Sequence, residues 1–368
     1  MSDIRTITIS EATKFLRFHF KQKQPVFIWG PPGIGKSDMV QQIADSLPNC
    51  LLIDVRLPLW EPTDIKGIPF FSQESKTMEW ARPSELPSEE EAAKYTHVIL
   101  FLDELNGAAP SVQAAAYQLI LNRKVGPYKL PDNVIIVAAG NRDSDKGVTY
   151  RMPKPLANRF LHYEIAVNFN DWNDWAINNG QHPDVVGYLT VKKNHLHNYE
   201  PTSNERSFAT PRSWSFVSKL LYDAADFSPS EVTDMVSAAV GQGVALSFSA
   251  HRKISNLLPD PRHILSGQIK TLKITEVSAV YSLAVSLAYE LKIAYEESKR
   301  DTNPDDFNEI RENFVAFVSN NFQPEMAVMC MKMVSNNYQI PMRLTALASG
   351  QSFLTKYSDM FTRLSLND

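Results

Sequence analysis

The sequence predicts an α/β fold in its first half, with a parallel sheet organised around a phosphate-binding loop, and helical regions after it. The apolar run 26–29 opens directly into a glycine-rich loop that ends in a Lys-Ser pair. A second apolar run, 98–102, ends in two adjacent carboxylates. Apolar runs alternate with helical patterns up to residue 165, which is typical of a parallel sheet.

The composition is that of an ordinary globular chain. Of 368 residues, 43% are hydrophobic and 21% are charged, which argues against disorder and allows two or three domains or subdomains. No run of about 18 apolar residues predicts a membrane span, and the first residues lack a signal-peptide pattern, so we expect a cytoplasmic protein. The net charge of -4 argues against a dominant nucleic-acid surface. Cys50 and Cys330 are expected to be reduced core residues.

The first part of the chain contains one unit of strand, loop, helix and strand. A helix is predicted over 10–22, with Ser10 as its N-cap, because apolar residues recur on one face. The strand 26–29 and its loop follow, then a helix over 38–47 and a β-rich run over 51–55. This order predicts neighbouring parallel strands.

Residues 57–87 interrupt the alternation and are predicted to be an insertion on the core. Prolines and aromatic residues over 67–80 indicate a hairpin. Most of its aromatic side chains are expected to pack in the interior of that hairpin.

The alternation then resumes with the strand 98–102 and a helix from Ser111. Two further β-like runs, 134–139 and 161–165, bring the predicted parallel sheet to five strands. The pattern becomes helical near residue 168, where we expect a domain boundary. Later helical patterns cover 211–223, a segment starting at Ser228, 274–298 and 304–320.

The loop 30–37 matches the G-x-x-x-x-G-K-[ST] phosphate-binding pattern at every fixed position. Its glycines let successive N–H groups point inward, toward phosphates at the positive end of the next helix. Lys36 is predicted to bridge the β- and γ-phosphates, and Ser37 to place its hydroxyl on Mg²⁺. A plain Pro/Gly turn is the alternative. The residues predicted to bind the nucleotide are Gly30, Pro31, Pro32, Gly33, Ile34, Gly35, Lys36, Ser37 and Asp38.

Asp103 and Glu104 stand at the end of a strand predicted to be buried on both faces. Ligands of parallel sheets bind at the carboxyl ends of the strands. Asp103 is therefore predicted to hold Mg²⁺ together with Ser37, and Glu104 to polarise a water against the γ-phosphate. An acidic helix N-cap is the alternative, which the upstream Lys-Ser loop disfavours.

The strand 134–139 ends beside Asn141. At this strand end the Asn141 amide is predicted to orient the attacking water, although in isolation such a residue is typical of a turn. Together with the loop and the carboxylates, it predicts an ATP hydrolase that uses Mg²⁺.

The order of these motifs resembles that of an AAA+ ATPase, and more closely the bacterial and phage MoxR-like ATPases of the helix-2-insert group. The resemblance spans roughly residues 25–220. It is carried by the stretches 55–57, 61–69, 101–106, 113–119, 138–142, 152–153, 156–160 and 209–214. It assigns Lys36 and Ser37 to Walker A, Asp103 and Glu104 to Walker B, and Asn141 to sensor 1.

The resemblance also assigns two arginines. Arg159 resembles the arginine finger that reaches the γ-phosphate of the adjacent subunit, and Arg212 resembles the sensor 2 arginine of the lid. A guanidinium suits a spreading phosphoryl charge because it is planar, charged and multidentate. Arg151 and Arg142 stay open as alternatives for the finger, and an inter-subunit salt bridge is the alternative role for each arginine.

The family resemblance implies a ring, usually hexameric, with each nucleotide bound between neighbouring subunits. It implies an α/β core over 1–168, a helical lid over 169–300 and a helical extension over 301–368. It further implies ATP-driven, chaperone-like remodelling of a protein client, often with a partner that carries a von Willebrand factor A domain. Phe70 and Phe71 of the insertion are candidates for client contact. A nucleic-acid motor related to restriction translocases and an ATP-gated scaffold are the alternative functions.

Overall fold

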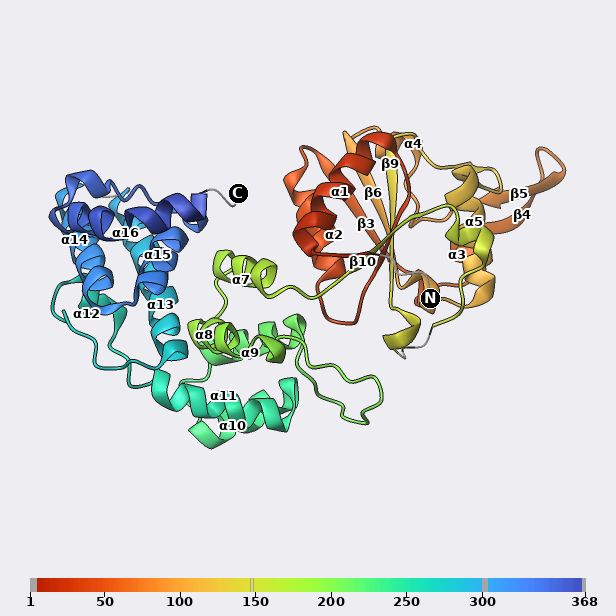
Figure 1. Cartoon of the computed structure of the whole chain (residues 1–368). Helices are drawn as coiled ribbons and strands as arrows, with labels where there is room; N and C mark the ends of the chain where they lie inside the picture. The colour runs from red at the N-terminus through yellow and green to blue at the C-terminus, as the bar shows by residue number, and fades with distance from the viewer. Residues whose placement is uncertain (1–4, 146, 148, 300–303, 366–368) are drawn as a thin grey trace. The chain divides into compact units, whose positions relative to one another are not determined.

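The computed structural model describes residues 5–145, 147, 149–299 and 304–365. The chain divides into two compact units. The first comprises the residues up to Asn168 together with Glu200–Asn204, and the second comprises Phe169–Tyr199 and the residues from Glu205 onward. The first unit is an α/β structure and the second is helical (Figure 1). The predicted boundary between residues 300 and 301 lies outside the described residues.

The first unit is built on a six-stranded parallel sheet with the order β1-β10-β2-β9-β6-β3. The strands are β1 (Thr6–Ile7), β2 (Val26–Trp29), β3 (Cys50–Arg56), β6 (His97–Asp103), β9 (Val134–Gly140) and β10 (Leu161–Ile165). The prediction of a parallel α/β core is confirmed, and the five predicted strands are all present. The sixth strand, β1, lies at the edge of the sheet and is too short to produce an apolar pattern.

Helices cover both faces of this sheet (Figure 1). Alternate residues of β6 enter two different cores, because neighbouring side chains of a strand point to opposite faces. Ile99 and Phe101 pack with α1 and α2, whereas Leu100 and Leu102 pack with α5. The helices of this unit are α1 (Ile9–Gln22), α2 (Lys36–Ser46), α3 (Pro62–Lys66), α4 (Glu89–Ala92), α5 (Pro110–Asn122) and α6 (Lys154–Ala157).

Helix α1 begins one residue earlier than predicted, and its N-cap is Thr8 rather than Ser10. The Thr8 hydroxyl accepts a hydrogen bond from the Glu11 N–H at 3.3 Å, and the Glu11 carboxylate accepts one from the Thr8 N–H at 2.9 Å. This reciprocal capping box satisfies two helix-end donors at once, so it decides where the helix starts.

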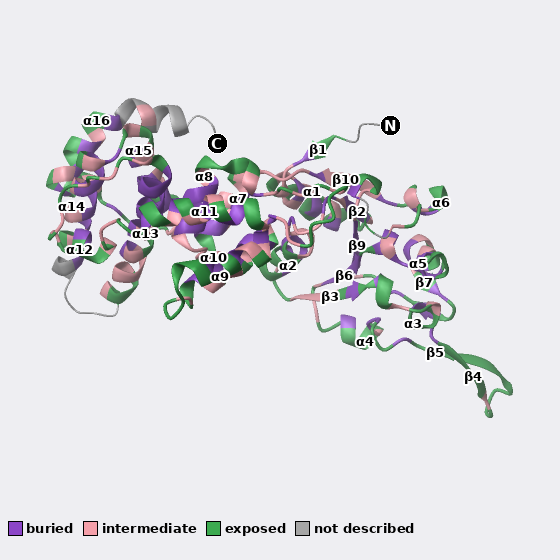
Figure 2. Cartoon of the chain, turned by 90° about the horizontal axis from the view of Figure 1, so that it is seen from below, coloured by how far each residue is buried: buried purple, intermediate pink, exposed green. Residues whose placement is uncertain are grey.

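The insertion forms an antiparallel hairpin of β4 (Ile68–Ser72) and β5 (Thr77–Ala81), and Figure 2 shows both strands largely exposed. The expectation that most of its aromatic side chains are packed inside is wrong, because Phe70, Phe71 and Trp80 are 45%, 61% and 41% exposed. An isolated two-stranded hairpin has no second layer to cover its faces. A second small hairpin pairs β7 (Lys124–Val125) with β8 (Tyr128–Lys129).

The second unit consists of helices. They are α7 (Phe169–Asn178), α8 (Pro183–Val191), α9 (Pro211–Tyr222), α10 (Pro229–Val240), α11 (Gln242–Ser255), α12 (Pro261–Leu265), α13 (Val277–Ser298), α14 (Pro304–Asn321), α15 (Pro324–Lys332), a π-helix (Met333–Asn337) and α16 (Ala348–Ser365). The predicted start of α10 is confirmed by the Ser228–Glu231 capping box.

Helix α13 is the central helix of this unit. Among the described residues it alone is long and apolar enough, by length and composition, to cross a membrane. Most of it is buried against neighbours that include α8, α11 and α14, which is the packing of a core helix. The two cysteines are free thiols: Cys330 is buried as predicted, whereas Cys50 is only half-buried.

Candidate nucleotide-binding site

The predicted phosphate loop lies between β2 and α2, at the carboxyl edge of the sheet. Gly33 and Gly35 have φ angles of 74° and 97°, in the left-handed region that favours glycine. Within the described part of the chain, the N–H groups of Gly33, Ile34 and Gly35 donate to no acceptor. Free amides ahead of the positive end of a helix form a cradle that fits a phosphate group.

The Lys36 ammonium group ties this loop to a second strand. It donates to the carbonyl oxygens of Gly30 and Pro31 over 2.8 and 3.0 Å. It also donates to Oδ1 of Asn141 over 3.0 Å, across 105 residues of sequence. Asn141 directly follows β9, the strand next to β2, so the strand order brings these two predicted site residues together.

Ser37 and Asp103 form a second contact of the same kind. The Ser37 hydroxyl donates to Oδ2 of Asp103 over 3.0 Å, and the Asp103 side chain is almost wholly buried at the end of β6. Hydroxyl and carboxylate oxygens are ligands that Mg²⁺ accepts. The two residues predicted to hold the metal are therefore neighbours, and their donor set fits it.

Glu104 follows Asp103 in an unusual backbone conformation. Its φ and ψ angles are 54° and 36°, a left-handed conformation that costs a non-glycine residue about 1–2 kcal/mol. Its N–H donates to Oδ1 of Asp103 over 3.0 Å, and its carbonyl accepts from Gly107 over 2.7 Å. Its side chain is exposed at the edge of the sheet. Strain of this kind concentrates at functional sites.

Asn106 belongs to the same cluster, although its position in the sequence predicts no role for it. Its side chain is buried, and Nδ2 donates to the Asn141 carbonyl over 2.8 Å. Its Oδ1 is buried and has no partner among the described residues. A Cβ added at Gly140 would lie only 2.1 Å from this oxygen. The one feature of the sequence that could have pointed to Asn106 is its polarity: it stands two positions after the paired carboxylates, within an otherwise apolar stretch.

Negative charge is concentrated at this edge of the sheet. Arg56 lies beside Asp103 in the register of β3 and β6. The pKa of Asp54, on the same strand, is raised by burial and then by the Asp103 carboxylate, against the opposing effect of Arg56. A carboxylate whose pKa is raised by a neighbouring carboxylate is one whose charge a bound cation would stabilise.

The candidate arginine residues differ in how they are held. Arg142 is paired with Asp145 at 2.7 Å and with Glu164 at 3.0 Å, and these partners, Asp145 first, raise its pKa. Arg151 and Arg159 are exposed and form no ion pair within the described residues. Arg212 is exposed in the first turn of α9, in the second unit.

The contacts thus join Lys36, Ser37, Asp103 and Asn141, and Glu104 is attached through Asp103. The Gly30–Gly35 loop is joined to these residues because Lys36 donates to the Gly30 carbonyl. Asp38, which is also predicted to bind the nucleotide, is exposed in the first turn of α2. The loop with its free amides and the residues at the ends of adjacent parallel strands define a P-loop nucleotide-binding domain.

Comparisons with known proteins show which kind of P-loop nucleotide-binding domain this is. Residues 25–162 match the family model described as "ATPase family associated with various cellular activities (AAA)". This segment, which makes up less than half of the chain, is an AAA+ ATPase domain. The enzyme class of such a domain is that of the ATP hydrolases.

Among curated proteins, the chain is 28% identical over 174 residues to midasin from Giardia intestinalis, a match that covers 45% of this chain and 3% of midasin. Among solved structures, a point mutant of RuvB from Thermotoga maritima is 17% identical with a TM-score of 0.36, covering 77% of this chain and 86% of that one. A DNA polymerase III gamma subunit-related protein from the same organism is 9% identical with a TM-score of 0.34, covering 94% and 97%.

Proposed function

We propose that this chain is a MoxR-like AAA+ ATPase that binds ATP with Mg²⁺ between the subunits of a hexameric ring. Hydrolysis would drive the remodelling of a protein client. The observation that carries the proposal is the pair of contacts Lys36–Asn141 and Ser37–Asp103, both 3.0 Å long, at the ends of adjacent strands. Loop, hydroxyl, carboxylate and amide are the parts that phosphoryl transfer to water requires.

Each residue has a separate task in this proposal. The loop amides and Lys36 would hold the phosphates, and Ser37 and Asp103 would hold Mg²⁺, which would supply positive charge against the phosphate oxygens. Glu104 takes a proton from the attacking water, and Asn141 orients that water through its amide. The exposure of Glu104 supports its role, because its carboxylate is open to a substrate that binds at the edge of the sheet.

Assembly into a ring follows from the assignment of Arg159. An exposed guanidinium without an ion pair in the described chain is available to a phosphate of a neighbouring subunit. Arg142 is already held by two carboxylates, so we favour Arg159 over it as the finger. Arg212 would sense the same nucleotide from the lid.

The β4–β5 hairpin is the proposed surface for the protein client. In its register Phe71 lies opposite Met78, and Pro69 lies opposite Trp80, so these four side chains share one face. Phe71 and Met78 are 61% and 60% exposed. An exposed apolar patch of this kind marks a protein-binding surface. We further propose a cytoplasmic location and an adaptor with a von Willebrand factor A domain, both from the family resemblance.

The experiment that tests this function is an ATPase assay with a native mass measurement, with and without ATP and Mg²⁺. We expect ATP-dependent assembly and hydrolysis, and at least about a tenfold loss of ATP affinity in Lys36→Ala. Lys21→Ala, on the exposed face of α1, is the matched control. No ATP binding at any protein concentration that permits self-association would refute the proposal. Hydrolysis stimulated by DNA with a steep salt dependence would point to a nucleic-acid motor instead.

A further inference from the structure

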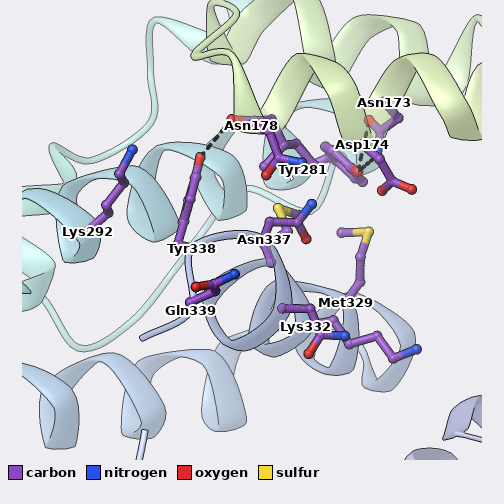
Figure 3. A pocket seen from close by; sticks show the side chains of 13 residues that line it. Asn173, Asp174, Asn178, Tyr281, Lys292, Met329, Lys332, Asn337, Tyr338 and Gln339 are labelled. Atoms are coloured by element: carbon purple, nitrogen blue, oxygen red, sulfur yellow. Dashed lines mark hydrogen bonds between the residues drawn. The ribbon is translucent and has the colours of Figure 1, made fainter. Parts of the chain in front are cut away.

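The second unit contains a groove that the proposed nucleotide site does not use (Figure 3). Its volume is about 780 Å³, within the range of ligand-binding sites. It is lined by one face each of α7 and α13, by α15, and by the π-helix with the two residues after it. π-helical turns are rare in proteins and occur frequently at functional sites.

The floor of the groove is apolar and aromatic. Tyr281 and Met333 are buried, and Met329 is half-buried beside them. The Tyr281 hydroxyl is held by Nδ2 of Asn173 at 3.1 Å, and the Tyr338 hydroxyl donates to the Ile177 carbonyl at 3.2 Å. These bonds fix the aromatic rings, whereas the methionines are flexible enough to accept varied side chains.

Carboxamides surround this floor. Asn178, Asn336, Asn337 and Gln339 line the groove, and their side chains form no hydrogen bond within the described chain. Asn337 projects from the π-helix toward α7 (Figure 3). A carboxamide offers both a donor and an acceptor, which is the complement of a peptide group.

The charges in the groove favour an acidic ligand. Among the described residues that line it, Lys292 and Lys332 carry positive charge and Asp174 carries a carboxylate. Lys292 lies 5.3 Å from the centre of the Tyr338 ring, which positions its ammonium group at the wall. The pKa of Asp174 is raised by burial first and then by the nearby Asp171 carboxylate.

We propose that this groove binds an extended, acidic segment of a partner protein. Carboxamides pair with its backbone, the methionine floor receives alternate apolar side chains, and the two lysines pair with its carboxylates. The site lies within the second unit and its binding needs no ATP, so this inference goes beyond the proposed hydrolysis and can fail independently of it.

The test is fluorescence anisotropy on the full chain with a short fluorescein-labelled peptide of alternating Glu and Leu. We expect saturable binding, and binding at least about tenfold weaker for the same peptide with Lys in place of Glu. The double variant Lys292→Ala/Lys332→Ala is expected to lose about tenfold in affinity, whereas Lys273→Ala, exposed outside the groove, keeps it.

A second variant guards against simple misfolding. Asn337→Asp is nearly isosteric and adds one negative charge, so it should weaken binding of the acidic peptide without changing the melting temperature. Methyl NMR should show Met329 and Met333 shifting on peptide addition. Unchanged affinity in the double-lysine variant overturns the proposal. Complete displacement of the peptide by inorganic phosphate also overturns it, because the groove would then be a simple anion site.

Discussion

The indole N–H of Trp29 donates to Nδ1 of His162 over 2.9 Å. Because an indole can only donate, Nδ1 carries no proton and Nε2 is the protonated nitrogen. Nε2 then donates to the carbonyl of Ala157 over 2.7 Å. Trp29 is the last residue before the phosphate loop, and Ala157 ends α6, two residues before Arg159. One side chain therefore connects the loop strand to the segment that carries the proposed finger.

His162→Phe should lower kcat about tenfold while ATP affinity changes by less than about twofold, because loss of the Ala157 bond misplaces Arg159 and leaves the loop intact. The measurement is steady-state ATPase kinetics alongside direct ATP binding. Trp29→Phe removes the indole donor that fixes the His162 tautomer, keeps an aromatic ring beside Phe27 and leaves the His162 Nε2–Ala157 bond possible, so it should reproduce only part of the effect. Equal losses of binding and turnover would show that His162 only stabilises the fold.

Glu104→Gln is expected to leave ATP binding intact and to slow hydrolysis by about 10²–10⁴-fold, because an amide cannot accept the proton of the attacking water. Single-turnover hydrolysis and a binding titration measure the two effects separately. Glu90→Gln, an exposed glutamate of α4, serves as the control. Normal turnover in the Glu104 variant contradicts its assignment as the base.

Arg159→Ala should reduce hydrolysis by about 10³-fold or more, since a finger contributes that much to phosphoryl transfer. Mixing it with Glu104→Gln subunits should restore part of the activity, because the second variant supplies an intact finger to the first. Arg151→Ala is the comparison. Should Arg151→Ala show the larger loss and the rescue, the finger is Arg151.

Gly140→Ala tests the packing behind Asn141. An added Cβ would lie 2.1 Å from Asn106 Oδ1 and 2.9 Å from the Phe27 ring, so we expect a loss of stability of about 1–3 kcal/mol. Thermal and urea unfolding give the value. At Gly243 in α11 an added Cβ meets nothing within 4 Å, so Gly243→Ala should be neutral or stabilising. Similar effects at both positions would contradict the crowding at Gly140.

The second unit should lose stability in mild acid. The Nδ1 of His182 accepts from the Asp184 N–H at 3.2 Å and caps α8, and burial lowers the pKa of His182 below its usual 6.5 despite the nearby Asp184 carboxylate. A lowered pKa means that the folded state resists protonation. The contribution of His182 to the free energy of unfolding is therefore full above pH 6.5, and it is lost as the pH falls from there toward the pKa of His182 in the folded state.

His182→Asn keeps a capping acceptor without a titrating ring, so its melting temperature should fall less between pH 7 and 5 than that of the parent chain. Melting curves over that pH range measure the difference. If the melting temperatures of the variant and the parent chain depend on pH in the same way, His182 does not cause the loss of stability in acid.

Local patterns determined much of this protein from the sequence alone. Alternating apolar runs predicted the five main strands, and the glycine and Lys-Ser spacing predicted the loop, because both depend on residues close together in the chain. The paired carboxylates were predicted for the same reason, since a strand that is apolar throughout ends at Asp103.

The tertiary structure alone decided which of these residues meet. The contact of Lys36 with Asn141 depends on β9 lying next to β2, and strand order is not a local property of the sequence. Packing between segments of the chain likewise decides that Asn106 is buried and that Arg142 forms ion pairs with Asp145 and Glu164. The exposed faces of the β4–β5 hairpin follow from the lack of a covering layer, which residue composition does not encode.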